Sequence, residues 1–94
     1  MESWPFEDPE NVWTMTVQQI THGGQPILRV CHAENGMWQF LTGRDPVRRA
    51  DAMLVSIRKV YTIDPSIAEV ADLPMGWTAE RSAPGQPWQR KPAC

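Results

Sequence analysis

Two histidines and two cysteines supply the imidazole and thiol groups of this sequence, which are the usual nitrogen and sulfur ligands of a metal ion; the thiols are also candidate nucleophiles. They are His22, Cys31, His32 and Cys94. No Cys-x-x-Cys or His-x-x-x-His spacing links them, and neighbouring strand residues such as Cys31 and His32 point to opposite faces of a sheet. We therefore expect no metal site and no cofactor.

A cysteine nucleophile remains formally open, because residues distant in sequence can meet in space. Cys31 lies in the apolar run Ile27 to His32, where a free cysteine usually behaves as a small hydrophobic side chain. His22-Gly23-Gly24 lacks the third glycine of a dinucleotide-binding loop and is typical of a turn. The sequence thus predicts no catalytic residue, and both cysteines are expected to be unpaired.

The pair Glu80 and Arg81, beside Trp77, could bind a polar ligand. Adjacent residues of a strand face opposite ways, which argues against their acting on one ligand and favours structural ion pairs. A second hypothesis concerns the five tryptophans, which are much aromatic surface for one small core. Those that do not fit inside would form an exposed patch of the kind found at protein interfaces. The candidate interaction or ligand surface is Trp13, Trp77, Glu80, Arg81 and Trp88.

Composition restricts the class of partner. The chain has 94 residues and a net charge of −2, without a basic surface for nucleic acid or for an anionic membrane. Its one basic cluster, Arg44, Arg48 and Arg49, is interrupted by Asp45. No apolar run approaches the ~18 residues of a membrane span, and acidic residues stand where a signal peptide would be basic. We expect a cytoplasmic protein that binds neither nucleic acid nor membrane.

The elements that must position these residues follow from local patterns. Residues 1–11 are acidic and proline-containing and predict an extended tail, anchored by Trp4 and Phe6. A single domain is expected over 12–91, with a C-terminal tail over 92–94. Alternation predicts a strand over 12–20, and Asn35-Gly36 predicts a hairpin between strands at 27–32 and 37–41. We expect these three strands to form an antiparallel meander.

The second half predicts helices and further strands. Residues 53–57 favour a short strand that leads into a helical turn through Tyr61, although so short an apolar run leaves strand or helix open. Asp64-Pro65 predicts a helix start for residues 65–71, which Leu73-Pro74 ends. Strands are expected over 75–82 and 88–91. The predicted fold is α+β, with one antiparallel sheet of five or six strands and one or two short helices on one side.

Several short motifs follow one another along the chain. They are Gly-Gly-x-Pro-Ile-Leu, Asn-Gly-x-Trp-Gln-Phe-Leu-x-Gly, Asp-Pro-Ser-Ile and Leu-Pro-x-Gly-Trp-x-Ala-x-Arg, followed by a final Trp. Over residues 12–90 the chain resembles a group of small uncharacterised bacterial domains, some of them predicted to be immunity proteins against toxins. The resemblance implies no catalytic residues and marks Gly36, Trp38, Phe40, Asp64, Pro65, Pro74, Gly76 and Arg81 as fold determinants.

Two functions from different classes follow. The first is a non-catalytic protein-interaction module, immunity-type in one form, that blocks or tethers a protein partner; a homodimer would use the same surface on itself. The alternative is a small-ligand-binding domain or enzyme with a pocket near Trp38, Trp77 and Arg81, which Glu80 would join. A flat, exposed aromatic patch or a strand edge would favour the first, and a concave site with convergent polar groups the second.

Overall fold

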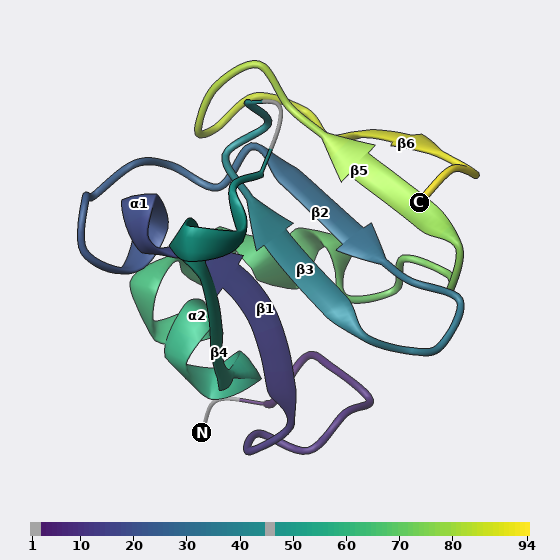
Figure 1. The fold of residues 1–94 in the computed structure, drawn as a ribbon. Helices are drawn as coiled ribbons and strands as arrows, with labels where there is room; N and C mark the ends of the chain where they lie inside the picture. Colours follow the sequence, from purple (N-terminus) through teal and green to yellow (C-terminus); the bar gives the residue numbers. More distant parts are fainter. Residues whose placement is uncertain (1–2, 45–46) are drawn as a thin grey trace.

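A computed structural model describes residues 3–44 and 47–94, so Asp45, which interrupts the basic cluster, lies outside the described residues. The chain forms one mixed, mostly antiparallel sheet of six strands in the order β4-β1-β3-β2-β5-β6 (Figure 1). The strands are β1 (Trp13–Val17), β2 (Arg29–His32), β3 (Trp38–Leu41), β4 (Ala52–Ser56), β5 (Trp77–Glu80) and β6 (Gln89–Lys91). The α+β class, with a single sheet of six strands, is confirmed.

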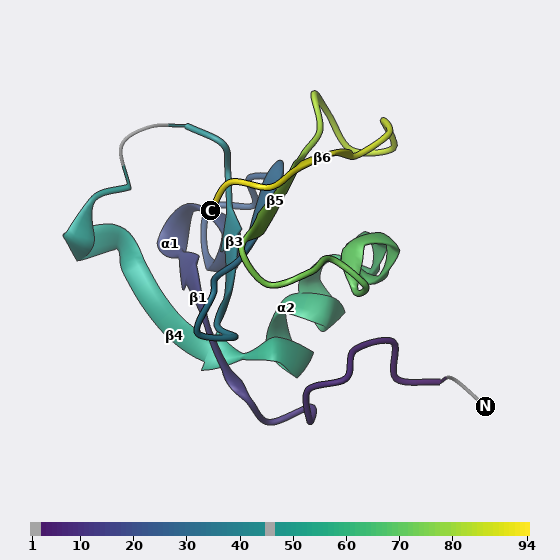
Figure 2. The same cartoon turned by 90° about the vertical axis from the view of Figure 1, so that its right-hand side faces the viewer.

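Helical segments connect the strands. They are α1 (Gln18–Thr21), the 3-10 segment η1 (Arg49–Asp51), α2 (Ile57–Ile63) and the 3-10 segment η2 (Pro65–Val70). Figure 2 shows the sheet nearly edge-on, with α2 and η2 on one side together with the N-terminal segment, and the C-terminus on the other side. The core lies between the sheet and α2 and η2, where Val30, Phe40, Ile57, Val60 and Ile67 are completely buried.

The β2–β3 hairpin forms as the Asn-Gly pair predicts. Ala33 N donates to Met37 O, and Gly36 occupies the turn with φ +89°. Met37 N also donates to the Asn35 side chain. A positive φ has no steric cost for glycine, which explains why the sequence marks this turn clearly.

The meander prediction is wrong. β1 does not pair with β2; it pairs antiparallel with β4 and parallel with β3, at Met15 opposite Gln39. The strand predicted over 12–20 ends at Val17, because the chain turns into α1. Gly23 passes so close to α1 that a Cβ there would lie 2.7 Å from Gln19 O, so the glycine pair ends a helix and does not close a hairpin.

The strand and the two helical segments predicted for residues 53–71 form close to their predicted places. The favoured strand at 53–57 is β4, and it leads directly into α2, which Ser56 caps by accepting a hydrogen bond from Lys59 N. The helix predicted over residues 65–71 is the 3-10 segment η2, which covers Pro65–Val70. Its start is as expected, with Pro65 in the first turn and the Asp64 carboxylate accepting from Ser66 N.

The turn into β5 uses two of the predicted fold determinants. Trp77 N donates to Pro74 O, and Gly76 has φ +85°. The strand itself covers Trp77–Glu80, shorter than the predicted 75–82, and β6 begins one residue after Trp88.

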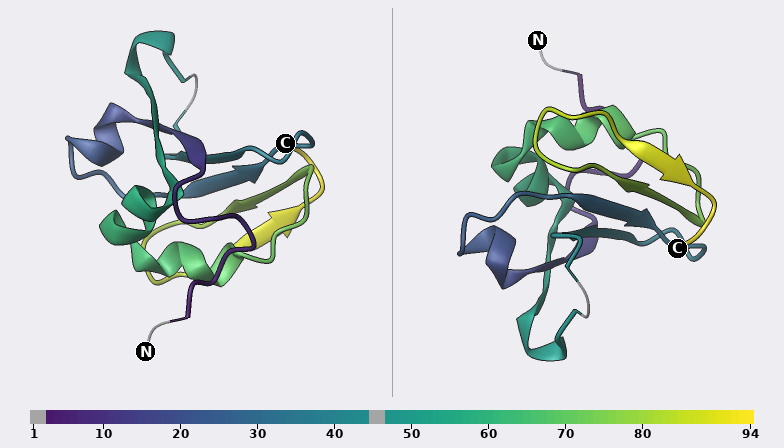
Figure 3. Two further views of the ribbon diagram at one scale, coloured as in Figure 1. Left: turned by 90° about the horizontal axis from the view of Figure 1, so that it is seen from below. Right: turned by 90° about the horizontal axis from the view of Figure 1, so that it is seen from above.

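The N-terminal segment from Ser3 onward lies across the helical side of the molecule, seen from below in Figure 3 (left). Phe6 is buried and its ring meets that of Trp38 edge-on, with 5.2 Å between centroids. Trp4 meets Tyr61 in the same way at 5.4 Å. The Asp8 carboxylate accepts a hydrogen bond from the Trp38 indole at 3.2 Å. This segment therefore covers part of the core.

Cys31 and Cys94, which were expected to be unpaired, lie together in the structure. The structure joins Cys31, on β2, to Cys94, the last residue, in a disulfide with a Cα–Cα distance of 5.7 Å. The pairing could not be expected from a separation of 63 residues. It arises because the chain beyond β6 turns back over the face of the sheet on which Cys31 lies, on the side away from α2 (Figure 2).

Candidate functional site

An exposed apolar strip lies on the face of the sheet that points away from α2. In β1, Thr14 and Thr16 are completely buried, so the alternating residues Trp13 and Met15 point to the opposite face. Leu54 stands directly opposite Met15 on β4 and shares that face. Trp13 is 66% exposed and Leu54 is 62% exposed, whereas Met15 between them is partly buried. We call these three residues the Trp13–Leu54 strip.

The strip lies at one end of the sheet. β4 is the first strand in the sheet order, so only β1 pairs with it. Within the described chain β4 otherwise packs mainly against α2, which follows it directly. A large exposed aromatic residue beside an edge strand forms part of a surface that suits the binding of another chain. The exposed side chains offer apolar contacts, and the edge strand offers backbone hydrogen bonds.

The five residues predicted as a surface do not form one site. Trp13 is on the strip. Glu80 is on the same face but three strands away, which is at least about 14 Å at the usual strand spacing of about 4.8 Å. Trp77, Arg81 and Trp88 belong to the other side: Arg81 is buried, and Trp77 and Trp88 are half-buried against the core.

Glu80 lies between two cations. Its carboxylate pairs with Arg29 at 3.2 Å and with Lys91 at 3.0 Å. The hydrogen bond from Lys91, followed by that from Arg29, lowers the pKa of Glu80 below its usual value. All three groups are on the strands β2, β5 and β6, so the triad links these strands on the face away from α2.

Arg81 joins several elements from the inside. Its Nε donates to Ile27 O at 3.0 Å, Nη1 to Ser66 Oγ at 3.0 Å and Nη2 to Asp64 Oδ2 at 2.9 Å. The guanidinium also lies 4.3 Å from the centre of the Trp88 ring. The side chain is only 1% exposed, so this geometry corresponds to a structural ion pair with a cation–π contact.

The pocket proposed for a ligand near Trp38, Trp77 and Arg81 has little geometric support. His32 stacks on Trp38 with 3.8 Å between ring centroids, and Phe6 and Phe40 pack on the same indole. Protein rings thus occupy the space that a ligand would need. The two cavities described below are lined by residues other than Trp38, Trp77 and Arg81.

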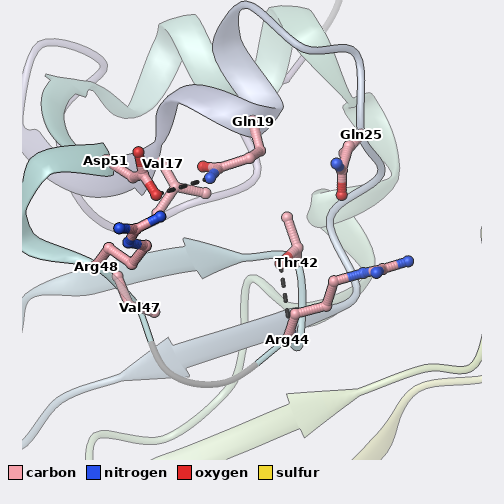
Figure 4. A pocket seen from close by; sticks show the side chains of 8 residues that line it. All are labelled: Val17, Gln19, Gln25, Thr42, Arg44, Val47, Arg48 and Asp51. Carbon is pink, nitrogen blue, oxygen red and sulfur yellow. Dashed lines mark hydrogen bonds between the residues drawn. The ribbon is translucent and has the colours of Figure 1, made fainter.

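Figure 4 shows one of these cavities. It has a volume of about 180 Å³ and its lining residues are Val17, Gln19, Gln25, Thr42, Arg44, Val47, Arg48 and Asp51. This is below the ~300 Å³ at which small-molecule sites begin. Gln19 and Gln18 both donate to the Asp51 carboxylate, which lowers the pKa of Asp51. The Asp51 carboxylate is therefore engaged by two amide groups, whereas Oε1 of Gln19 is buried with no hydrogen-bond partner among the described residues.

A second cavity, of about 330 Å³, adjoins the disulfide. Of the predicted surface residues it includes only Glu80. The charged groups of its wall are Arg29, Glu80 and Lys91, which already pair among themselves. Its charged side chains therefore all take part in ion pairs, in which two cations share one carboxylate.

Metal ligands are not gathered in the described chain. Among residues 3–44 and 47–94, no three His, Cys, Asp or Glu side chains lie close enough together to hold a metal ion. In that same part of the chain, no helix has the length and apolar character needed to cross a bilayer.

Comparison with known proteins adds no relative, since no family model, curated protein or solved structure matches this chain. The resemblance to small bacterial domains with immunity-type relatives therefore stays a prediction.

Sequence reasoning identified Trp13 as a surface candidate but missed Met15 and Leu54. Met15 shares the alternation of β1 with Trp13, a signal that was present in the sequence. Leu54 reaches the strip only because β4 pairs antiparallel with β1 in the register that sets Leu54 opposite Met15. That register joins residues about 40 positions apart, which no local pattern specifies.

Proposed function

We propose that this protein is a non-catalytic protein-interaction module that binds a protein partner through the Trp13–Leu54 strip. The observation that carries the proposal is the 66% exposure of Trp13 beside a 62% exposed Leu54 at the edge of the sheet. Burying large apolar side chains is favourable, and tryptophan is the residue most enriched among those that dominate binding energy at interfaces. Binding there would block or tether the partner without chemistry, and an immunity-type protein is one form of this function.

A pair of variants tests the proposal. Trp13→Ala combined with Leu54→Ala removes the exposed apolar atoms of the strip, whereas Met75→Ala removes those of a 60% exposed residue in the turn before β5. We expect the immobilised wild-type protein and Met75→Ala to retain the same partner from a lysate of the source organism. The double variant should bind that partner at least 30-fold more weakly, which corresponds to about 2 kcal/mol for a central interface tryptophan.

Two controls accompany this measurement. Thermal unfolding should show that both variants remain folded, because neither Trp13 nor Leu54 belongs to the buried core. A light-scattering mass separates a hetero-partner from self-association. Equal retention by all three proteins would contradict the proposed site, and a wild-type dimer that the double variant abolishes would assign the strip to a second copy of the chain.

A cytoplasmic site of action is part of the proposal and bears on the disulfide. Disulfides are rare in a reducing cytoplasm. We therefore expect Cys31 and Cys94 to be thiols in the cell and to pair only after oxidation. Alkylation with iodoacetamide at the moment of lysis, followed by an intact mass, should add two labels to the chain. A chain that acquires labels only after reduction would place the protein in an oxidising compartment instead.

A further inference from the structure

We infer that the partner contributes an extended segment, with acidic side chains at its ends, which adds to the sheet as a seventh strand beside β4. The inference rests on the proposed function and specifies the partner's chemistry. Three observations carry it: the backbone groups that β4 directs away from the sheet, the apolar strip beside them, and the distribution of charge.

The hydrogen bonding of β1 determines which backbone groups of β4 are unused. Ile57 N donates to Val12 O, so Val12 and Ile57 form a hydrogen-bonded pair in the antiparallel register. Such pairs alternate along a ladder, and Thr14–Val55 and Thr16–Met53 are therefore the next ones. Ala52, Leu54 and Ser56 consequently direct their backbone groups outward.

Two of these outward groups are engaged within the chain. Ala52 N donates to Arg49 O at the end of η1, and Ser56 is the N-cap of α2, whose carbonyl accepts the first helical bond. The remaining groups are Ala52 C=O, Leu54 N–H, Leu54 C=O and Ser56 N–H. They provide two donors and two acceptors along five residues, a pattern that an added strand can satisfy.

The apolar strip extends the same binding surface. Leu54 is central both to the free backbone groups and to the Trp13–Leu54 strip. A strand beside β4 would place alternate side chains on the face that carries Leu54 and Trp13. Backbone pairing would then supply affinity and the strip would select apolar residues at alternate positions of the partner.

The charge distribution around β4 indicates which residues stand at the two ends of the partner segment. Residues 44–59 carry five basic and two acidic side chains, a net charge of +3, so the remainder of the chain carries −5. The exposed cations stand at both ends of β4, with Arg48 and Arg49 before it and Arg58 and Lys59 after it. Arg58 pairs with Glu10, but no ion pair of Lys59 is found among the described residues. Acidic residues at the ends of the added strand would complement this arrangement.

The same charge argues against a second copy as the occupant. Two copies paired through β4 about a twofold axis would bring two such segments of +3 together, and like charges across an interface oppose association. An acidic segment of another protein meets no such opposition. Raising the salt concentration from 50 to 500 mM should accordingly weaken its binding, because screening reduces attraction between exposed charges.

A peptide selection tests the inference even while the partner is unidentified. The immobilised protein selects from a displayed library of random nine-residue peptides, and the selected peptides are synthesised for titration. We expect alternating β-forming residues with Asp or Glu at the ends. Bound peptide should slow amide hydrogen exchange at Leu54 and Ser56 in the wild-type protein.

Variants separate the contributions. Leu54→Pro removes an outward N–H, which an edge strand tolerates, and should lower peptide affinity at least tenfold; Leu54→Ala, which keeps the N–H, should lower it less. Lys59→Glu should weaken acidic peptides severalfold, and Met75→Ala should change nothing. If Leu54→Pro fails to fold, slowed amide hydrogen exchange at Leu54 and Ser56 of the wild-type protein still shows whether the peptide adds to β4 as a strand.

The outcomes are distinguishable. Strand addition is overturned if the peptides need Trp13 yet bind Leu54→Pro with full affinity. It is also overturned if bound peptide leaves amide exchange at Leu54 and Ser56 unchanged. In both cases the Trp13–Leu54 strip remains a binding site. Basic selected peptides overturn the acidic partner. Failure to select any peptide that depends on Trp13 or Leu54 overturns strand addition, and if the lysate experiment is also negative the proposed function falls with it. A wild-type dimer dissociated by Leu54→Pro assigns the edge to a second copy.

Discussion

Trp38→Ala is expected to lower the free energy of unfolding by about 3–5 kcal/mol, the usual cost of removing a large aromatic side chain from a core. Trp38 is 1% exposed and is the largest of the fully buried side chains. His32, Phe6 and Phe40 pack on its ring, and its indole N–H donates to Asp8. The substitution therefore leaves a cavity and releases the N-terminal segment together.

The matched control is Trp13→Ala, the same chemical change on another strand of the same sheet. Trp13 is 66% exposed, so its removal should change the free energy of unfolding by no more than about 0.5 kcal/mol. Urea unfolding followed by circular dichroism measures both variants with one method. Similar losses in the two variants would contradict the assignment of Trp38 to the core and Trp13 to the surface.

Such a loss is large for this chain. Domains have free energies of unfolding of about 5–15 kcal/mol, and a small domain tends to lie near the lower end. Trp38→Ala is therefore expected to leave a measurable unfolded population at 25 °C. The core of this protein depends on few side chains, and the aromatic cluster around Trp38 is its centre.

Features fixed by neighbouring residues could be predicted from the sequence. Asn35-Gly36 specifies the β2–β3 turn because only a residue tolerant of positive φ suits position 36. Asp64-Pro65 specifies the start of η2 because the carboxylate accepts a hydrogen bond two residues further on. In both cases the determinants lie within a few residues of the structure that they produce.

Features fixed by contacts between distant residues could not be predicted from the sequence. The parallel pairing of Met15 with Gln39 depends on where the chain goes after α1, and the disulfide depends on the C-terminus meeting β2. The candidate site has the same mixed origin. Trp13 was found by its residue type, whereas Leu54 joins it only through the β1–β4 register.

Removing the Arg81 side chain is also expected to cost much of the free energy of unfolding, because this residue carries a buried charge in a small domain. Arg81→Ala removes the bonds to Ile27 O, Ser66 Oγ and Asp64 and the contact with Trp88. Breaking a buried ion pair by removing one partner typically costs about 3–5 kcal/mol, since the other group loses its compensation. We expect a loss of about 3 kcal/mol, at the lower end, because Asp64 retains 24% exposure and can be hydrated.

Arg58→Ala is the matched control, since it removes the same side chain from an ion pair of similar length. Arg58 and Glu10 are 2.7 Å apart and Arg81 and Asp64 are 2.9 Å apart, but Arg58 is 53% exposed and Arg81 is 1% exposed. Exposed pairs contribute between about 0 and 1 kcal/mol. Urea unfolding of the two variants thus compares a buried with an exposed ion pair of nearly the same length. Equal losses in the free energy of unfolding would show that the Arg81 contacts stabilise the fold no more than a surface ion pair does.

Arg81→Lys separates charge from shape in the same cluster. Lysine keeps the positive charge but cannot donate in three fixed directions or stack a planar group on Trp88. If the forked hydrogen bonds hold Ile27, Ser66 and Asp64 together, Arg81→Lys should lose most of what Arg81→Ala loses. A lysine variant with the stability of the wild type would mean that charge alone matters. The convergence of Ile27, Asp64 and Ser66 on this residue would then be a consequence of the fold and not its cause.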